Sequence, residues 1–186
     1  MAVIGTSGSG KTTLARRLAE RLDAPHLELD AVHHQPGWTP LPAEDFRRVV
    51  TEFCAAERWV TCGKYGVVRD ILLDRADTIV CLDHGRTRQT ARVYRRSWGR
   101  VLRREELWNG NREPLAALWP FGREAEEVCV ARWTWRNVPR ARRLFDRVEA
   151  DRGPDQSVVR LRGWRQIDAF LAGVSSPPAA GALDEN

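Results

Sequence analysis

A glycine-rich segment near the start of the chain has a spacing with a specific chemical use. Residues 5–12, GTSGSGKT, fit the pattern G-x-x-x-x-G-K-[ST]. The glycines let the backbone curl so that N–H groups point at an anion, and the following helix adds a favourable dipole. Lys11 is expected to reach the β and γ phosphates of a nucleoside triphosphate such as ATP, and the Thr12 hydroxyl to ligate Mg²⁺. The predicted nucleotide-binding residues are Gly5, Ser7, Gly8, Ser9, Gly10, Lys11, Thr12 and Thr13.

Two acids follow at the end of a predicted strand. Glu28 and Asp30 are two residues apart, so a strand places both carboxylates on one face. Acids beside a triphosphate hold the waters of Mg²⁺ or orient the hydroxyl of an acceptor. Asp30 is therefore predicted to act on the acceptor and on the metal. A loop cap at Asp30 and a surface carboxylate at Glu28 are the structural alternatives.

Aromatic and basic residues suit the other side of such a site. The segment 33–38, HHQPGW, is stiffened by proline, and it offers an aromatic wall and a polar contact. His33 and Trp38, together with Tyr65, are the predicted substrate contacts; each histidine has the alternative of a satisfied loop residue. The stretch 105–114, EELWNGNREP, predicts a flap over about 100–122 that closes over phosphates and excludes water. The alternative is a helical excursion whose arginines pair with Glu124, Glu126 and Glu127.

Composition limits the class of protein that carries these residues. The chain has 186 residues, of which 42% are hydrophobic and 30% charged, so we expect one domain without a membrane-spanning segment. The net charge of +5 comes from an arginine-rich middle, which suits an anionic partner or is a solvated helical surface. The four cysteines lack metal-binding spacing, which favours reduced thiols in the cytoplasm.

Short apolar segments alternate with helical ones along the chain. Strands are expected at 2–4, 26–30, 59–62, 78–82 and 158–161, and helices at 11–22, 42–57, 68–73, 86–106, 123–148 and 164–171. This alternation predicts an α/β fold with a parallel sheet covered on both faces, in which ligands bind at the carboxyl ends of the strands. Residues 1–173 form a single domain in this interpretation, and 174–186 a disordered tail.

Several strings together resemble a known family. They are GTSGSGKTTLA, LELD-x-x-HH-x-PGW, a strand ending in G-x-Y, RADTIVCLD and ELWNGNREP. They are similar to the adenylate-kinase-like P-loop proteins, some of which are labelled topology-modulation proteins and which are related to shikimate and gluconate kinases. The resemblance covers about Met1 to Leu171, and ELWNGNREP is more specific than the phosphate loop.

The resemblance implies a P-loop NTPase three-layer sandwich. Its five-stranded parallel sheet has the order 2-3-1-4-5, a helical lid follows strand four, and ATP and Mg²⁺ are used. By resemblance, Lys11 and Thr12 are phosphate and metal residues and Asp30 is an acceptor-side or metal-side acid. The lid candidates are Arg96, Arg104 and Arg112, which with Lys11 and Asp30 make up the predicted catalytic set. The acceptor is not implied.

One departure from the family pattern affects the chemistry. The family has D-G-N-Y where this chain has Cys62-Gly63-Lys64-Tyr65, so the acid at the end of strand three is absent. In related kinases that acid helps to hold Mg²⁺ through water. If Asp30 or Asp83 does its work, the enzyme is expected to be active; if neither does, the chain binds nucleotide but transfers slowly. Lys64 either replaces metal charge or lowers the pKa of Cys62.

These observations leave three functions to weigh. The first is a kinase that moves the γ-phosphoryl group of Mg·ATP to a small-molecule or nucleotide acceptor. The second is a nucleotide-binding regulatory protein or weak ATPase without efficient transfer. The third, a nucleic-acid-binding ATPase that uses the arginine-rich middle, is the least favoured. The sequence identifies neither the acceptor nor the oligomeric state.

Overall fold

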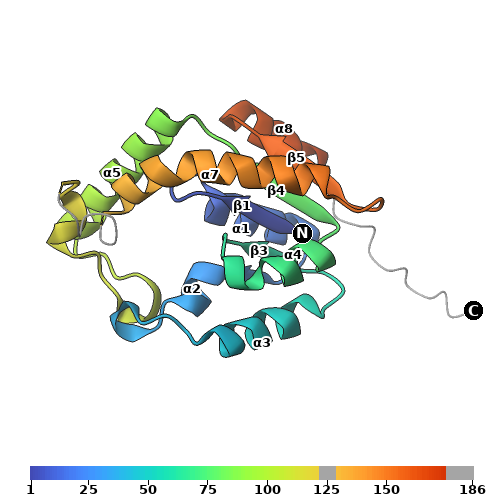
Figure 1. Ribbon diagram of the computed structural model, residues 1–186, viewed down its shortest axis with the longest axis horizontal. Helices are drawn as coiled ribbons and strands as arrows, with labels where there is room; N and C mark the ends of the chain where they lie inside the picture. The colour runs from blue at the N-terminus through green and yellow to red at the C-terminus, as the bar shows by residue number, and fades with distance from the viewer. Residues whose placement is uncertain (122–128, 175–186) are drawn as a thin grey trace, which may run out of the picture.

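The computed structural model describes residues 1–121 and 129–174 as alternating strands and helices (Figure 1). Five strands form one parallel sheet in the order β2-β3-β1-β4-β5. The expected fold class and strand order are thus confirmed. The strands are β1 (Ala2–Gly5), β2 (His26–Glu28), β3 (Val60–Cys62), β4 (Thr78–Leu82) and β5 (Ser157–Leu161).

Helices cover both faces of this sheet, and short 3-10 turns lie in the loops. The helices are α1 (Lys11–Leu22), α2 (Leu29–His33), α3 (Ala43–Cys54), α4 (Arg69–Arg75), α5 (Arg86–Leu102), α7 (Val130–Ala150) and α8 (Trp164–Gly173). The 3-10 turns are η1 (Pro36–Trp38), η2 (Gly66–Val68), η3 (Trp108–Gly110) and η4 (Leu115–Leu118). The expected tail and the expected helical stretch at 123–128 lie outside the described residues.

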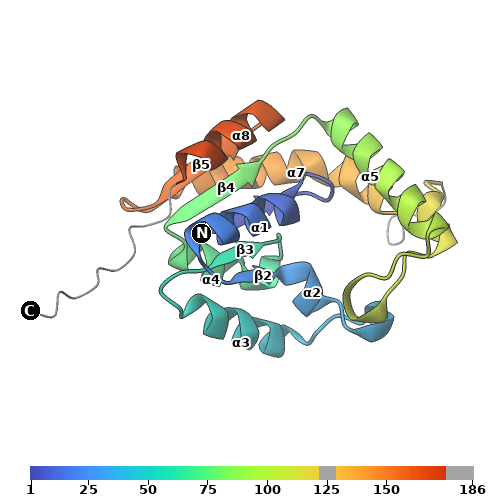
Figure 2. The same cartoon turned by 180° about the vertical axis from the view of Figure 1, so that it is seen from behind.

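Alternation along the strands divides the core into two layers. On β1, Ala2 and Ile4 face the layer of α3, α4 and α7, whereas Val3 faces α1 and α8. Figure 2 shows α1 and α8 together on the second face. Because both faces are covered, the central strands are apolar throughout; all four residues of β1 are buried. The three-layer sandwich is thereby confirmed.

The second strand differs from the prediction. It ends at Glu28, and the chain turns at once into α2, which contains Asp30. Two features explain the change. Leu29 is fully buried in the core, and its neighbour strand β3 ends at Cys62 before Gly63, whose φ of 149° breaks the extended path. Glu28 and Asp30 therefore point from a strand and a helix rather than from one strand face.

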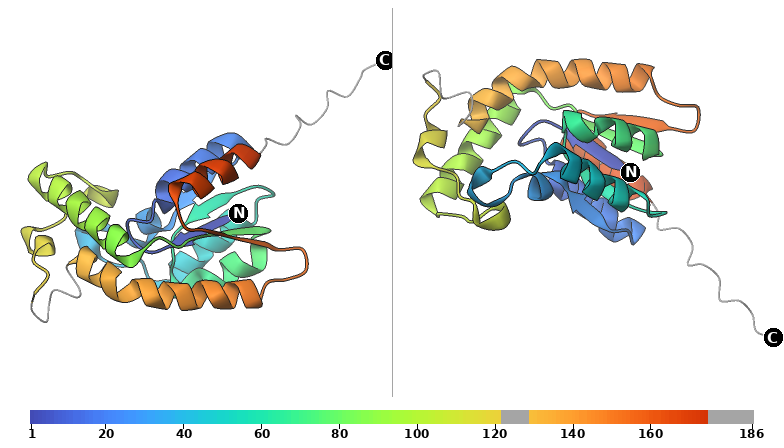
Figure 3. Two further views of the ribbon diagram at one scale, coloured as in Figure 1. Left: turned by 90° about the horizontal axis from the view of Figure 1, so that it is seen from above. Right: turned by 60° about the horizontal axis from the view of Figure 1, so that its bottom comes forward.

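The segment after α5 lies against residues 31–38. α5 extends away from the sheet, and the loop around η3 that follows it lies against η1 (Figure 3). Asn109 Nδ2 donates hydrogen bonds to the carbonyl oxygens of Ala31, at 3.1 Å, and His34, at 2.6 Å. The loops around η1 and η3, more than 70 residues apart in the sequence, therefore form one wall. None of the helices in the described ranges is both long and apolar enough for a membrane span.

Candidate active site

The phosphate loop lies between β1 and α1 in the shape that its glycines permit. Gly8 has φ 72° and Gly10 has φ 91°, values that favour glycine. A Cβ atom on Gly8 would lie 2.3 Å from Val93 Cγ2 of α5, so the loop also approaches α5 too closely for a side chain. Lys11 follows directly, and its Nζ donates a 3.3 Å hydrogen bond to the carbonyl oxygen of Thr6.

Side chains from α5 and the end of β4 hold the outer carbonyls of this loop. Gln89 Nε2 donates to the Ser7 carbonyl oxygen at 2.9 Å and to Thr6 Oγ1. His84, which is buried, has its ring nitrogens 3.0 Å from the Ser9 carbonyl oxygen and 3.2 Å from that of Arg162. Neither Gln89 nor His84 was predicted, because no sequence motif marks a residue that supports a carbonyl oxygen.

The metal side of the site pairs Thr12 with Glu28. Thr12 Oγ1 donates a 2.9 Å hydrogen bond to Glu28 Oε1, whereas Asp30 lies in α2. A hydroxyl and a carboxylate are hard oxygen donors of the kind that Mg²⁺ prefers. No larger group of histidines, cysteines and acids able to hold a metal occurs among the described residues. Thr12 and Glu28 are thus the pair that fits Mg²⁺.

Cys62 lies beside this pair as a neutral thiol. Its Sγ is 3.8 Å from Thr12 Oγ1 and 3.3 Å from His26 Nε2. Burial raises the pKa of Cys62 to about 12, and the cation that opposes this rise is Lys11 rather than Lys64. Burial, and then the nearby Arg69 and Lys11, lower the pKa of Lys64 itself.

Asp83 does not replace the missing acid. Its carboxylate is buried, accepting from Arg142 Nε at 2.8 Å and from Arg160 Nε at 2.9 Å. These two bonds tie the end of β4 to α7 and β5. The carboxylate is thus neutralised within the fold, and the expectation of a metal role for Asp83 loses its basis.

Asp30 belongs to a second hydrogen-bonded group. Tyr65 donates its hydroxyl to Asp30 Oδ1 at 2.6 Å, and His34 Nε2 lies 3.3 Å from the same hydroxyl oxygen. Burial raises the pKa of Tyr65, and the negative charge of Asp30 raises it further. Tyr65 therefore remains a protonated donor that fixes the Asp30 carboxylate.

A cavity of about 600 Å³ brings Lys11, Asp30 and Tyr65 together, whereas Thr12, Glu28 and Cys62 are not part of its lining. Its lining comes from the phosphate loop, α2, the loop after β3, α5, the segment 107–117 and α7. The lining residues are Gly5, Ser7, Lys11, Asp30, His34, Trp38, Lys64, Tyr65, Arg96, Arg100, Leu107, Trp108, Glu113, Pro114, Ala117, Val130 and Trp133.

Two loop tips form an aromatic wall of this cavity. The Trp38 and Trp108 rings meet edge to face at 6.4 Å, and the His34 ring stacks on Trp108 at 5.8 Å. Asn111 joins the tips: its Oδ1 accepts from the Trp38 backbone N–H at 2.8 Å, and its Nδ2 donates to the Gln35 carbonyl oxygen at 2.9 Å. Trp38 has φ 60°, a conformation that a bulky residue adopts only where its surroundings enforce it.

Two arginines of α5 reach the cavity with different partners. Arg96 donates to Ser7 Oγ at 2.9 Å and thus touches the phosphate loop. Arg100 donates to Glu113 Oε1 at 2.9 Å, and the side chains of this pair are only 16% and 5% exposed. Arg96 therefore offers its charge to a ligand, whereas the charge of Arg100 is neutralised.

The sequence of the region that contains the phosphate loop matches a known protein family. The profile of a family described as an AAA domain matches residues 1–104, which run from β1 through the phosphate loop to the end of α5. The chain belongs to this AAA domain family. No curated protein matches the sequence of this AAA domain.

Solved structures with the same fold include two shikimate kinases. One from Acinetobacter baumannii, in complex with shikimate, is 18% identical, with a TM-score of 0.55 over 92% of this chain and 87% of its own. One from Bacteroides thetaiotaomicron is 15% identical, with a TM-score of 0.53 over 92% of this chain and 94% of its own. A gluconokinase from Sinorhizobium meliloti 1021 is 22% identical over 78% and 95% of the chains, at a TM-score of 0.40. The shikimate kinases show that this AAA domain has a P-loop NTPase fold.

The structure places some predicted site residues outside the cavity lining. His33 packs against Phe46 and Tyr65, and its neighbour His34 lines the cavity instead. Arg104 is exposed in the turn after α5. Arg112 pairs with Glu106 at 3.6 Å, and only its carbonyl oxygen contacts Trp38. The cause is the early end of α5 at Leu102, after which the chain turns and carries these arginines away.

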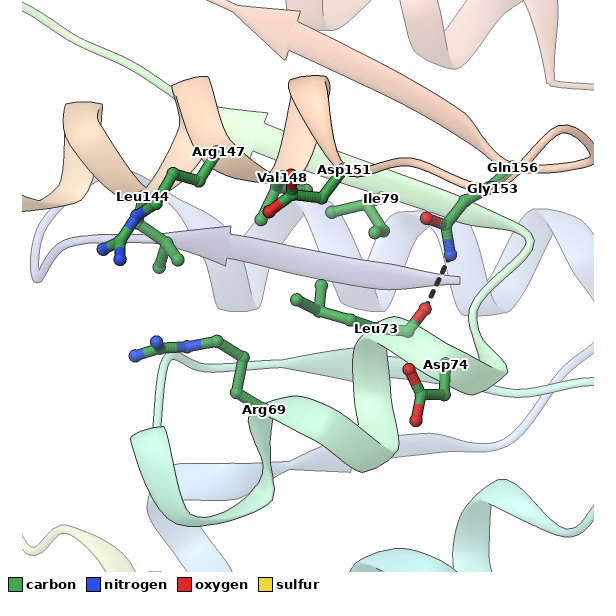
Figure 4. A pocket seen from close by; sticks show the side chains of 10 residues that line it. All are labelled: Arg69, Leu73, Asp74, Ile79, Leu144, Arg147, Val148, Asp151, Gly153 and Gln156. Atoms are coloured by element: carbon green, nitrogen blue, oxygen red, sulfur yellow. Dashed lines mark hydrogen bonds between the residues drawn. The ribbon is translucent and has the colours of Figure 1, made fainter.

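A second cavity, of about 530 Å³, lies between α4 and α7 (Figure 4). Arg69 and Arg147 lie at one end of it, and Gln156 at the other donates a 2.6 Å hydrogen bond to the Leu73 carbonyl oxygen. Its lining contains no residue of the phosphate loop. The cavity that contains Lys11 and Asp30 is therefore the candidate active site.

Proposed function

We propose that the protein transfers the γ-phosphoryl group of Mg·ATP to a hydroxyl group of a small-molecule or nucleotide acceptor. The observation that carries this proposal is the shared cavity: Lys11 of the phosphate loop and the Asp30–Tyr65 pair line the same space. A phosphate loop alone would serve any nucleoside triphosphatase. A carboxylate held by a tyrosine opposite the loop adds a group that can act on an acceptor.

Each residue has a definite task in this reaction. Lys11 and the backbone N–H groups of residues 7–12 hold the phosphates and stabilise the charge that develops on them. Asp30 orients the acceptor hydroxyl and takes its proton as the oxygen forms a bond to the γ phosphorus. The bond from phosphorus to the bridging oxygen breaks, and its electron pair remains on the departing diphosphate. Tyr65 keeps the Asp30 carboxylate in place throughout.

Mg²⁺ would be held by Thr12 and Glu28 and would supply positive charge between the phosphates. Glu28 thereby helps to hold Mg²⁺, the role that the related kinases give to the acid that is replaced here by Cys62. Arg96 adds a second charge beside Ser7. The segment of about 100–122, where described, acts as the lid, because its tip docks on residues 31–38 and covers the acceptor side from water.

A nucleotide-binding protein with little transfer is the second candidate. Cys62 favours it, because a neutral thiol beside Thr12 supplies no hard oxygen ligand. Four free, buried cysteines support a reducing compartment, the cytoplasm, for either function.

Replacement of Lys11 tests the proposal. In a screen of nucleoside monophosphates, polyols, sugars and aminoglycosides, we expect one class of acceptor to stimulate ATP consumption. Lys11→Ala should lower that rate by about 10²–10³, the usual cost of one preorganised charge-stabilising donor. Arg17→Ala, on the exposed side of α1, is the control. Acceptor-independent ATP consumption that Lys11→Ala leaves unchanged would contradict the proposal.

A further inference from the structure

The acceptor side of the cavity is built from aromatic rings. Trp38 and Trp108 come from the two loop tips, Tyr65 from the loop after β3, and Trp133 from α7. Figure 1 shows α2 with its following turn across from α7. Indole faces bind planar rings by stacking, whereas a polyol needs a dense set of hydrogen-bonding groups. The volume of about 600 Å³ is in the range of pockets for drug-sized ligands.

Two cations of the cavity form no ion pair with an acid among the described residues, although the negative charges of Glu113, Asp30 and Glu105 act on Arg96. Arg96 donates only to Ser7 Oγ, and its Nε is buried without a hydrogen-bond partner. Lys64 lies over the Trp133 ring at 5.9 Å, and its charged neighbours Arg69, Lys11 and Arg140 are all basic. Charges in such surroundings are stabilised by an anion. Lys11 serves the donor phosphates, so Arg96 and Lys64 can serve an anion of the acceptor.

Glu113, another residue of the cavity lining, has an unsatisfied acceptor. Its Oε1 receives the hydrogen bond of Arg100, while its Oε2 is buried without a partner among the described residues. A buried carboxylate oxygen without a donor costs free energy unless a ligand supplies an N–H or O–H group. The ligand therefore carries a donor as well as an anion.

Asp30 decides which group of the ligand accepts the phosphoryl group. Its carboxylate is held by Tyr65 on the wall of the cavity. A carboxylate repels a phosphate or carboxylate nucleophile but accepts the proton of a hydroxyl. The anion of the ligand is thus a recognition group, and a hydroxyl is the reacting one.

From these four observations we infer that the acceptor is an anion that bears a planar ring and is phosphorylated on a hydroxyl group. This inference rests on the proposed function. The ring stacks in the tryptophan-lined space, the anion binds Lys64 and Arg96, and a donor of the ligand meets Glu113. The hydroxyl oxygen bonds to the γ phosphorus, its proton goes to Asp30, and the bridging oxygen leaves with ADP. Nucleoside monophosphates and hydroxylated heteroaromatic phosphates share this chemistry.

Binding calorimetry separates this class from the polyols. The donor site is first filled with a non-hydrolysable ATP analogue and Mg²⁺, so that added nucleotides report on the acceptor side alone. The probes are AMP, CMP, pyridoxine 5′-phosphate, adenosine, ribose 5-phosphate and gluconate. At least one of the first three should bind about tenfold or more tighter than adenosine, which lacks the anion, and ribose 5-phosphate, which lacks the planar aromatic ring. The preferred probe tells nucleotides from other heteroaromatic phosphates.

Matched variants assign the two recognition elements. Lys64→Met should weaken the preferred anion about tenfold and leave adenosine nearly unchanged, whereas Trp108→Ala should weaken both. Trp108→Phe keeps a ring and should recover much of the affinity. Arg143→Met and Trp98→Ala remove the same kinds of side chain outside the cavity lining and should change neither affinity. The unfolding midpoint of each variant checks that it is folded.

The outcomes of these experiments test the inferred acceptor class separately from the proposed kinase function. Gluconate or ribose 5-phosphate binding as tightly as AMP, CMP and pyridoxine 5′-phosphate would overturn the inference, as would equal losses for AMP and adenosine in Lys64→Met. Lys11-dependent phosphorylation of a polyol would leave the kinase function standing and reject this acceptor class. Tight binding of a ring-bearing anion without Lys11-dependent transfer would support the recognition site and reject the kinase function.

Discussion

The two halves of the cavity are assembled in different ways. The donor half, residues 5–12, is one continuous segment that curves through glycines and leads directly into α1. The acceptor half, residues 30–38 and 107–113 with Lys64 and Tyr65, is assembled from separate loops. Its two tips are joined by side chains of Asn109 and Asn111.

This difference implies that the donor half binds the nucleotide, whereas the acceptor half determines which acceptor is used. A loop that holds phosphates through backbone N–H groups does not depend on the identity of the acceptor. A wall made from two loops can change its residues without disturbing the sheet, because its contacts lie beyond the carboxyl ends of the strands. Changes in the donor half should therefore affect every substrate, and changes in the acceptor half should discriminate among them.

The largest effect that separates the halves is expected at Asp30. Asp30→Asn keeps the size of the side chain and a hydrogen bond to Tyr65 but removes the proton acceptor. Transfer should fall by about 10²–10⁴, the usual contribution of a general base. Affinity for an ATP analogue, measured by calorimetry, should stay within about twofold of the original. A parallel loss of nucleotide affinity would mean that Asp30 belongs to the donor half.

A smaller effect, confined to the donor half, is expected at Glu28. Glu28→Gln removes the charge beside Thr12 and should raise the Mg²⁺ concentration needed for half-maximal binding of an ATP analogue by about tenfold. Nucleotide binding measured without Mg²⁺ should not change. Glu20→Gln, at an exposed position of α1, is the control. An unchanged Mg²⁺ requirement would assign the metal to other residues.

In the acceptor half, Asn111→Ala should have a moderate effect. Asn111 is buried and makes hydrogen bonds with Trp38, Gln35 and Trp108. Its loss should lower the free energy of unfolding by about 1–3 kcal/mol and raise the KM for the acceptor severalfold. Amide hydrogen exchange should become faster in residues 31–38 and 107–113 but not in the phosphate loop.

Asn137→Ala tests whether that effect is specific. Asn137 Nδ2 makes one exposed bond to the Trp133 carbonyl oxygen, four residues back in α7. This variant should change stability by at most about 1 kcal/mol. If both variants perturb the two loops equally, the bridge through Asn111 is not what joins the tips.

The smallest expected effect is a pH dependence of stability. Burial lowers the pKa of His26, His33 and His34 from 6.5, so the folded protein binds fewer protons at these sites than the unfolded chain. Stability is therefore greatest above about pH 6.5 and should fall as the pH drops below that value. Denaturant midpoints between pH 7.5 and 5 measure the fall. His33→Gln should reduce the slope; a midpoint that rises on acidification would contradict the assignment.

Sequence reasoning succeeds where the determinants are local. Residues 5–12 predict the phosphate loop because glycine spacing, a strand before and a helix after all lie in one short segment. The prediction that the second strand continues to Asp30 is wrong, because the early end of β2 depends on the burial of Leu29 and on the end of β3. Sequence reasoning also misses Gln89 and Asn111, whose partners lie more than 70 residues away. The string ELWNGNREP signals a functional loop without revealing what it touches.

The burial of all four cysteines makes the chain convenient for optical and magnetic labelling. Cys54, Cys62, Cys81 and Cys129 are all inaccessible, and burial raises the pKa of the first three. A thiol introduced at an exposed position should react with a maleimide or a nitroxide reagent far faster than these four. One label in η1 and another near η3 would then report the separation of the two loop tips directly, without any removal of native cysteines.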